Sequence, residues 1–400
     1  MSTAFGDLLA TPLRSGFTIP ASTRGHGVRM LNMGELFRHP RVPDIEMTRV
    51  TPPSASDERA YLAVGDLMFA RRSLTLEGAG KCAIIGAVGE PTTWESSIIR
   101  ARVDRSLASP EYLFYYFRSP AGRRTVETIV EQVAAAGIRL SELAKLRVPT
   151  PALAEQQAIA EVLGALDDKI AANTTLVSRS AALAATEFAA SIRAGSSAVT
   201  ISDATTFVAR GITPNYSEST DSTMLVLNQK CVRDRRVSLT QARRTLLTRT
   251  RPEKTLQTGD ILVNSTGQGT LGRVARWTVS ETATVDSHIT IVRADPALHD
   301  VTVFGQGLLA MESQIEALAE GSTGQTELSR VELGRLEIRL PSQDQQSRLG
   351  PQLRSLIEVE SAFETENRIL AEARDALLPQ LMSGKLRVRD AEQLASEAGA

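Results

Sequence analysis

The feature that most constrains this 400-residue chain is an internal repeat with an offset of 190 residues. Sliding the sequence by that distance without a gap places Pro151 over Pro341 and Gln156 over Gln346. A weaker similarity extends upstream, where "FGDLLATPLRSGFTIP" resembles "ISDATTFVARGITP" and "YLAVGDLMFARRS" resembles "TLQTGDILVNSTG". Self-similarity at a fixed period marks repeated structural units. The chain is therefore predicted to contain two copies of one unit, each a mixed globular region followed by a long helix.

Both helical segments carry seam residues at alternating steps of four and three, which is the spacing of a coiled coil. The apolar seam residues expected to be buried are Ile159, Leu163, Leu166, Ile170, Leu349, Leu353, Leu356, Phe363, Leu370 and Leu377. Polar residues interrupt the seams at Asn173, Glu360, Asn367 and Arg374. A buried polar residue can set the register of a helix pair, and it can also face a different protein.

Two seams of equal length in one chain can bury each other, most simply as an antiparallel pair. Gly195 and Gly384 follow the helical patterns and suit C-terminal caps. Each helix is then about 35 residues or roughly 50 Å long, which makes the pair a rigid spacer. An ordinary dimerisation coiled coil would have the same periodicity and stays an alternative.

The globular halves read as short strands and turns with a few helices. "DILVNS", "RVARWTV" and "HITIVRA" carry β-branched and aromatic residues between Gly, Asp and Ser breakers. Helices are expected near "PEYLFYYFRSPAGRRTVETIVEQ" and "VFGQGLLAMESQIEALAEG". We predict an α+β fold with domains at 1–142 and 195–332, helical spacers at 143–194 and 333–390, and a C-terminal tail at 391–400.

Composition excludes several classes of protein. No run of 18 apolar residues exists, and the N-terminus lacks the basic start and apolar core of a secretory signal, so we expect a cytoplasmic protein without a membrane segment. The two cysteines and four histidines have no spacing typical of a zinc site or a disulfide framework. A net charge of -1 gives no general case for a polyanionic partner.

One segment of the chain does have the local positive charge expected for binding a polyanion. The stretch 230–254, "KCVRDRRVSLTQARRTLLTRTRPEK", holds nine Lys or Arg against two acidic residues. A lone arginine is usually a solvated surface charge, but nine against two favour a DNA-binding face.

Motifs of catalysis are scarce. "GQGTLG" has the G-x-G-x-x-G spacing, but the following "RVARWTV" predicts a strand, so no helix N-terminus would face a pyrophosphate. We therefore expect a glycine-rich loop that lets the backbone approach a ligand or a DNA phosphate. Asp66 and Asp260 fall in "GD" turns before strands, where a turn role is favoured over catalysis.

Six segments of the sequence resemble those of a known family. "PALAEQQAIAEVLGALDDKI", "LNQKCVRDRRVSL", "GDILVNSTGQGTLGRV", "VDSHITIVR", "GSTGQTELS" and "LLPQLMSGKLRV" are similar to segments of the specificity (S) subunit of type I restriction-modification systems, HsdS. The resemblance covers essentially the whole chain, although "LNMGELF" in the first half lacks the Gln and Lys of "LNQKCV".

The resemblance implies a non-catalytic, cytoplasmic subunit in which each recognition domain binds one half of a bipartite, asymmetric DNA target. Paired helices would set the distance between half-sites and dock two methyltransferase (M) subunits, joined by restriction (R) subunits in assemblies that cleave. No cofactor is expected in this chain. S-adenosylmethionine for adenine N6 methylation, and ATP and Mg for translocation and cleavage, would bind to the partner subunits.

DNA contacts require Arg, Lys, Asn and Gln at base edges, and basic, hydroxyl and backbone groups at phosphates. The candidates in the second domain are Arg210, Asn228, Gln229, Lys230, Arg233, Arg235, Arg236, Asn264, Ser265 and Gln268. In the first domain, position in the repeat suggests Asn32, Arg71 and Arg72.

A protein of another class remains open. A coiled-coil adaptor or scaffold that binds only proteins would carry the same helices, with the arginine-rich stretch as solvated surface. A nuclease is a weaker third hypothesis.

Overall fold

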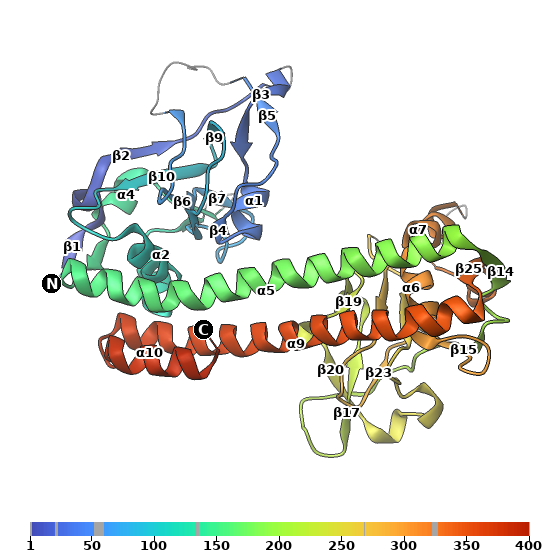
Figure 1. Ribbon diagram of the computed structural model, residues 1–400. Coiled ribbons are helices and arrows are strands. Elements are labelled where there is room, and N and C mark those ends of the chain that lie inside the picture. Colours follow the sequence, from blue (N-terminus) through green and yellow to red (C-terminus); the bar gives the residue numbers. More distant parts are fainter. Residues whose placement is uncertain are drawn as a thin grey trace. The chain divides into compact units, whose positions relative to one another are not determined.

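The computed structural model of the chain describes residues 2–20, 23–51, 60–132, 136–267, 269–321 and 327–399. The chain divides into two compact units, Met1–Ala171 with Glu366–Ala400, and Ala172–Thr365. Each unit combines a mixed helix-and-sheet domain with one half of each of two long helices (Figure 1). The predicted α+β class is confirmed. The domain boundaries drawn from the sequence follow chain order, whereas the compact units divide both long helices between them.

The first domain contains a five-stranded sheet in the order β2-β10-β6-β8-β4. Its strands are β2 (Leu9–Ser15), β10 (Ile98–Val103), β6 (Leu67–Ala70), β8 (Cys82–Ile85) and β4 (Arg41–Val42). A second sheet has the order β5-β3-β9, from β5 (Arg49–Val50), β3 (Arg24–Leu31) and β9 (Thr92–Trp94). The remaining strands are β1 (Ser2–Ala4), β7 (Arg72–Ser73), β11 (Glu131–Gln132), β12 (Ala136–Gly137) and β13 (Arg147–Pro149).

Strand β6 explains how this domain builds two cores. Successive side chains of a strand point to opposite faces. Leu67 and Phe69 therefore pack in one hydrophobic cluster with α2 (Pro110–Arg118), while Met68 and Ala70 pack in another with Leu31 and Trp94. All four residues of β6 are buried, as expected of a strand covered on both faces. The other helices of the domain are α1 (Met33–Arg38), α3 (Pro120–Glu127) and α4 (Leu140–Lys145).

The second domain repeats this plan. One sheet has the order β15-β24-β21-β22, from β15 (Thr205–Arg210), β24 (Ile289–Ala294), β21 (Ile261–Asn264) and β22 (Val274–Arg276). The other has the order β16-β20-β17-β23, from β16 (Tyr216–Ser217), β20 (Arg243–Leu246), β17 (Thr223–Leu227) and β23 (Ala283–Val285). The parallel pair β17–β23 corresponds to the parallel pair β3–β9.

Further elements complete the second domain. They are β14 (Ser196–Thr200), β18 (Val232–Arg233), β19 (Arg236–Val237), β25 (Glu337–Pro341), α6 (Val301–Ala310), α7 (Glu312–Gly321) and α8 (Arg330–Arg335), with short 3-10 turns at 229–231, 239–241, 247–249 and 252–254. Strand β14 pairs antiparallel with β25, as β1 pairs with β13 in the first domain. The predicted repeat is therefore a repeat of topology.

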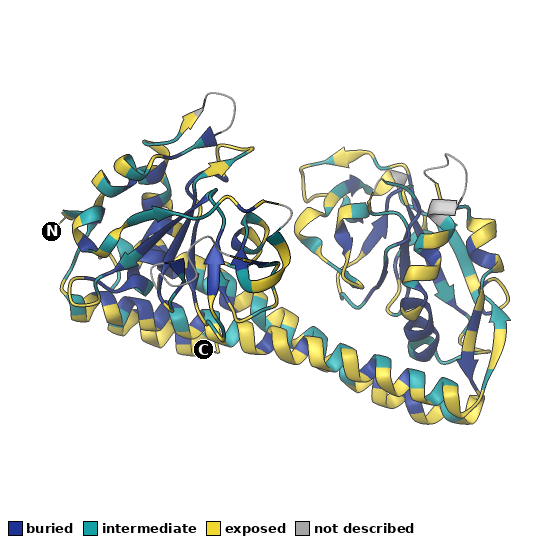
Figure 2. Cartoon of the chain, turned by 90° about the horizontal axis from the view of Figure 1, so that it is seen from above, coloured by how far each residue is buried: buried dark blue, intermediate teal, exposed yellow. Residues whose placement is uncertain are grey.

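The long helices are α5 (Leu153–Ala194) and α9 (Gln343–Met382), of 42 and 40 residues. Within each unit their two halves run antiparallel, as predicted, and they are longer than the expected lengths (Figure 1). Figure 2 shows buried, intermediate and exposed residues following one another along the long helices. Helix α9 ends in the predicted glycine cap: Gly384 has φ +68°, its N–H donates to Leu381, and the N–H of Lys385 donates to Gln380.

The seam residues of the long helices also pack against other elements. In the first unit Leu163, Leu166, Leu370 and Leu377 share one core with α2 and with α10 (Val388–Glu397). Ile159 belongs to the same core, and Ile170 packs against it half-buried. In the second unit Leu349 and Leu353 pack with Phe188 of α5 and Val303 of α6, and Leu356 lies beside them. Phe363 is half-buried.

A glutamine near the start of each long helix joins that helix to its domain. The Gln156 side chain accepts a hydrogen bond from the backbone N–H of Ser109 at 3.0 Å and donates to the carbonyl of Pro151 at 2.9 Å. Gln346 does the same, accepting from Asp300 at 2.9 Å and donating to Pro341 at 2.8 Å. Both glutamines are almost completely buried.

Each of these glutamines binds the backbone at the start of a helix in its domain. Ser109 and Asp300 are the N-cap residues of α2 and α6. The repeated "QQ" at the helix starts therefore orients each domain's main helix against the long helix that follows it.

Candidate nucleic-acid interface

The two carboxylates of the "GD" turns are structural. Asp260 accepts two hydrogen bonds from Arg293, from Nε at 2.8 Å and from Nη2 at 2.7 Å. Asp66 and Arg102 form the same bidentate pair with the same two distances. Both aspartates are buried, and each also accepts a backbone N–H three residues before it. Their predicted turn role is confirmed, and their lone pairs are engaged within the protein.

The glycine-rich loop joins β21 to β22. Gly267, Gly269 and Gly272 have φ of +102°, +73° and +84°, a region that favours glycine. The segment after the loop is strand β22, as predicted, so no helix begins directly after the loop. Gly272 also permits a close approach, because a Cβ there would lie 2.6 Å from the Cα of Glu316 in α7.

Two predicted contact residues lie beneath this loop. Asn264 and Ser265 are fully buried. The Asn264 side-chain amide donates to the carbonyls of Gln229 at 3.0 Å and Thr270 at 3.1 Å, and the Ser265 hydroxyl bonds that of Thr290 at 2.6 Å. These side chains hold the loop in place instead of reaching its surface. Gln268, the remaining predicted residue of the loop, lies outside the described residues.

The turn after β17 lies against the same loop. Asn228 caps a single 3-10 turn, accepting from the N–H of Lys230 at 2.9 Å and donating to the carbonyl of Gln241 at 2.6 Å. The Gln229 side chain donates to the hydroxyl of Thr266. Lys230 is exposed. This turn and the glycine loop form one surface at the end of the strands.

The predicted arginines of the basic stretch differ in what they contact. Arg235 pairs with Glu312 of α7 at 3.0 Å. Arg236 reaches α9, where it lies 3.6 Å from Glu360 and 3.2 Å from Glu364. Arg233 is exposed, and its nearest carboxylate is that of Asp234, its exposed neighbour, at 3.8 Å.

Arg210, on β15, also has partners within the second unit. It donates to the carbonyl of Leu328 at 2.9 Å and pairs with Glu327. Of the predicted basic residues in this domain, Lys230 and Arg233 are therefore the freest to meet a ligand.

The charges around Arg236 lie in a small internal site. A cavity of about 130 Å³ is lined by residues of α5, α6, α9 and the segment 234–237. Burial raises the pKa of the Glu360 and Glu364 carboxyls above the ordinary value. Burial also lowers the pKa of Arg276 to about 10, and this guanidinium donates to the carbonyl of Thr302 at 3.1 Å. The arrangement fastens the second domain to its helices.

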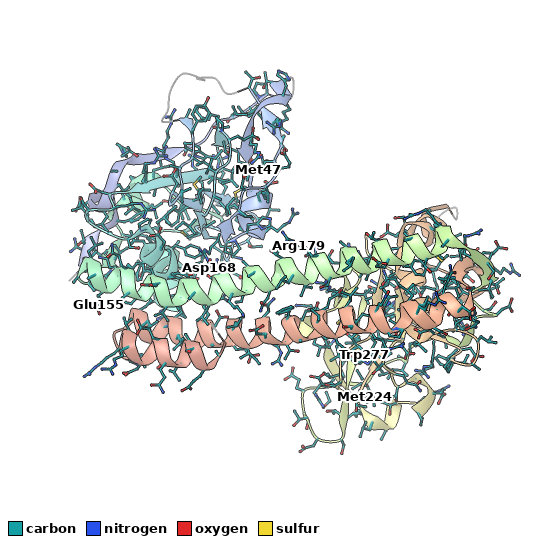
Figure 3. All side chains as sticks on the ribbon, in the orientation of Figure 1. Met47, Glu155, Asp168, Arg179, Met224 and Trp277 are labelled. Carbon is teal, nitrogen blue, oxygen red and sulfur yellow. The ribbon has the colours of Figure 1, made fainter. Side chains whose placement is uncertain are left out.

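The first domain has an equivalent of this contact. Arg41 and Val42, on β4, correspond to Arg236 and Val237, and Arg41 pairs with Asp168 of α5 at 2.5 Å. Asp168 is labelled on α5 in Figure 3. Sequence reasoning missed this pair, although "RVP" over "RVS" at an offset of 195 residues was the available signal.

The predicted residues of the first domain are only partly accessible. Asn32 caps α1 in a capping box with Glu35 and occupies the place that Asn228 has in the second domain. Arg71 is half-buried, and Arg72 is exposed on β7. Arg72 lies where the first domain has its counterpart of the glycine loop, and Lys81, at the end of the segment between β7 and β8, is a second exposed cation there.

A network of ion pairs in the first domain is a further difference between the two domains. Arg29 and Arg49, on neighbouring strands β3 and β5, both contact Glu90, at 2.5 Å and 2.7 Å. Arg29 also pairs with Asp44. The hydrogen bond from Arg29 and the nearby charge hold the pKa of Asp44 below its usual range, as Arg49 does for Glu90. These two arginines are thus neutralised by the protein's own carboxylates.

Within the described ranges, no cluster of three His, Cys, Asp or Glu side chains could hold a metal ion. In the same part of the chain, no helix is both long enough and apolar enough to cross a bilayer. The geometry is that of two related α+β domains, each anchored to an antiparallel helix pair and each carrying a loop and a capped turn at one end of its strands.

Comparison with known proteins identifies a similar family and a similar fold. Residues 55–178 match the family model of the type I restriction modification DNA specificity domain. The S subunit of a type I restriction-modification system from M. genitalium matches with a TM-score of 0.59 and 13% identity, over 95% of both chains. The HsdS subunit from Thermoanaerobacter tengcongensis matches at 15% identity over 96% and 97% of the chains, with a TM-score of 0.35. No curated protein matches in sequence.

The M. genitalium match establishes a shared fold over nearly the whole chain, and the lower TM-score of the other match adds no argument. Residues 55–178 are similar to the type I restriction-modification DNA specificity domain, and nearly the whole chain shares the fold of an S subunit, so the resemblance predicted from the sequence is confirmed at that level.

Proposed function

We propose that this chain is the DNA sequence-recognition subunit of a type I restriction-modification complex, with one half-site for each domain. The observation that carries the proposal is that the unit matched by the specificity-domain model recurs in the second half with the same internal bonds. The Gln156 and Gln346 contacts and the two bidentate Asp–Arg pairs are the clearest examples. Two copies of a DNA-reading unit in one chain suit a target of two half-sites.

In the second domain, the exposed candidate residues would contact DNA and the buried ones would hold the structure around them. Lys230 and Arg233 are exposed cations suited to phosphates, and Asn228 and Gln229 lie half-exposed beside the glycine loop. Asn264 and Ser265 are buried and would act by holding that loop in place. Arg235 and Arg236 would act by binding the domain to α7 and α9. In the first domain, Arg72 and the Asn32 turn take the corresponding places.

The helices are the proposed docking surface for two methyltransferase subunits. Large apolar side chains remain exposed on them, namely Leu176 and Leu183 of α5 and Val359 and Ile369 of α9. Grouped apolar side chains on a surface are typical of protein interaction sites, and Leu176 and Leu183 lie two turns apart on one face of α5. Catalysis, S-adenosylmethionine, ATP and Mg belong to the partner subunits in this proposal, and the complex would work in the cytoplasm.

Binding of duplex DNA as a function of salt is the first test. The full chain, alone and co-purified with its methyltransferase subunit, should bind a selected sequence more tightly than random DNA. Its affinity should fall steeply with salt because basic residues release counterions from phosphates. A salt-independent affinity without sequence preference would favour the adaptor alternative, in which the chain binds proteins only.

The spacing role has its own test. Inserting one heptad into α5 and one into α9 at facing positions should lengthen the gap between the selected half-sites and leave each half-site unchanged. A heptad replaced by one of equal length but different sequence is the matched control. An unchanged gap in the lengthened protein would contradict the role of the helices as a spacer.

A further inference from the structure

One arginine of the basic stretch is stacked on an aromatic ring. The guanidinium carbon of Arg243 lies 3.5 Å from the centroid of the Tyr216 ring. The two residues belong to neighbouring strands, since β16 pairs with β20 through Tyr216↔Thr245 and Ser217↔Arg244. Tyr216 is 41% exposed and Arg243 is exposed, so the stack lies at the surface of the second domain. Figure 3 labels Met224 on the adjacent strand β17.

We infer that Arg243, held flat by Tyr216, is the residue through which the second domain reads a guanine of its half-site. The inference rests on the proposed function and names a base contact within it. A guanidinium carries its donors in one plane, and that fork matches O6 and N7 of guanine in the major groove. Stacking on a ring fixes the plane of the guanidinium while leaving the donors at its edge free.

Its neighbours in the stretch are engaged differently. Arg244 donates to the hydroxyl of Thr223 at 2.8 Å, and Lys254 donates to the carbonyl of Gly211 at 2.6 Å. Arg236 is held by α9. In the part of the chain that the structure describes, no hydrogen bond or ion pair joins the Arg243 guanidinium to another residue. Its donors are therefore available to a ligand.

The position of the stack fits a base contact. Tyr216, Arg243 and Arg244 line an open hollow of about 450 Å³ with Ser217 and Glu218. Arg243 opposes Val226 on β17, one residue before the end of that strand. Asn228, which follows β17, bonds the carbonyl of Gln241, two residues before Arg243. The stack is thus on the strands that lead into the turn proposed to contact DNA.

In the described part of the first domain, the arginines of the corresponding strands are held differently, apart from the exposed Arg24 at the start of β3. On the corresponding strands β3 and β5, Arg29 and Arg49 are paired with Asp44 and Glu90. In the register of these strand pairs, Arg49 takes the place of Arg244 and Thr48 takes the place of Arg243. The stacked arginine is therefore a threonine at the matching position of the first domain, and on this inference the two domains would read different half-sites.

The test compares sequence selection by the full chain with that of Arg243→Ala, Arg243→Lys and Tyr216→Ala. In Arg243→Ala, the preference for guanine should be lost at one base pair of one half-site, by on the order of 10- to 100-fold. Arg243→Lys should lose the same preference while keeping most of the affinity, because an ammonium lacks the fork. Tyr216→Ala should weaken it, and Tyr216→Phe, which keeps the ring, should not.

Base analogues then test the contact itself. Replacing the identified guanine by 7-deazaguanine removes N7 and should weaken binding by the wild type, with no further loss in Arg243→Ala. The other half-site and the thermal unfolding of each variant serve as internal controls.

A uniform loss of affinity for all sequences would identify a phosphate contact and overturn the inference. Unchanged selection by a well-folded Arg243→Ala would also overturn it. In both cases the wild type would still select a bipartite sequence, whereas a wild type without any sequence preference would instead refute the proposed function.

Discussion

Gln156 binds the residue that caps another helix: its side-chain oxygen accepts a hydrogen bond from the backbone N–H of Ser109, the N-cap of α2, at 3.0 Å. Gln346 holds Asp300, the N-cap of α6, in the same way. The two glutamines lie 190 residues apart and are the repeated signal from which the duplication was first inferred. The repeat in sequence therefore marks a repeated joint between a domain and a long helix.

Removing this joint should destabilise the protein. Gln346→Ala leaves the buried N–H of Asp300 without its side-chain acceptor and the carbonyl of Pro341 without its donor. We expect a loss of about 1 to 3 kcal/mol in the free energy of unfolding, as measured by urea titration. Gln157→Ala, at an exposed position of α5, is the matched control and should change little. Equal effects of the two variants would contradict the importance of the joint.

The bidentate pair Asp260–Arg293 should be essential for folding rather than for chemistry. Asp260→Asn removes the charge while keeping the shape, and it leaves a mostly buried guanidinium without its counterion. We expect a destabilisation of about 3 kcal/mol, observed as a lower melting temperature. Asp221→Asn, in an exposed loop, is the control. A normal melting temperature with a specific loss of methylation by the assembled complex would instead indicate a catalytic carboxylate.

Arg236 and Arg233 should separate stability from DNA binding. Arg236→Ala removes the cation that faces Glu360 and Glu364 and should lower stability by about 1 kcal/mol. Arg233→Ala should leave stability unchanged and should reduce the slope of log affinity against log salt by about one, the value for one lost phosphate contact. The converse pattern would show that Arg236 is the DNA contact.

The carboxyls of Glu360 and Glu364 should make stability pH-dependent. Burial raises their pKa in the folded state, so between the ordinary value of 4.5 and the raised values the folded chain binds more protons than the unfolded chain. The stability from the protonated forms is complete below the unfolded pKa and is lost as pH rises through the folded values. Melting temperatures of wild type and of Glu360→Gln with Glu364→Gln, measured from pH 4.5 to 7, should diverge accordingly. A wild type that gains stability with pH relative to this variant would refute the assignment.

The long helices and the repeat were predictable because their information is local and periodic. A seam at alternating steps of three and four, with Gly384 at its end, indicates a helix without knowledge of its surroundings. The strand after "GQGTLG" and the turn role of Asp66 and Asp260 were also predicted, since each depends on a few neighbouring residues. The arginine partners of those aspartates, 36 and 33 residues away, were not.

The accessibility of the candidate site residues depends on distant parts of the chain. Asn264, Ser265 and Arg236 have residue types suited to DNA, and nothing adjacent to them in sequence reveals that the first two are buried or that the third reaches α9. The stack of Arg243 on Tyr216 likewise joins residues 27 positions apart through strand pairing. Residue type indicated which side chains could contact DNA, and tertiary contacts decide which are free to do so.

By itself, the sequence determined the duplication, the two helices with their seams, the glycine cap at Gly384, the α+β class and the family resemblance, because periodicity and short motifs are properties of adjacent residues. Only the tertiary structure decided how each domain is fastened to its helix and which charges are satisfied internally. Those outcomes depend on hydrogen bonds and ion pairs between residues far apart in the chain, whose geometry arises when strands pair and helices pack.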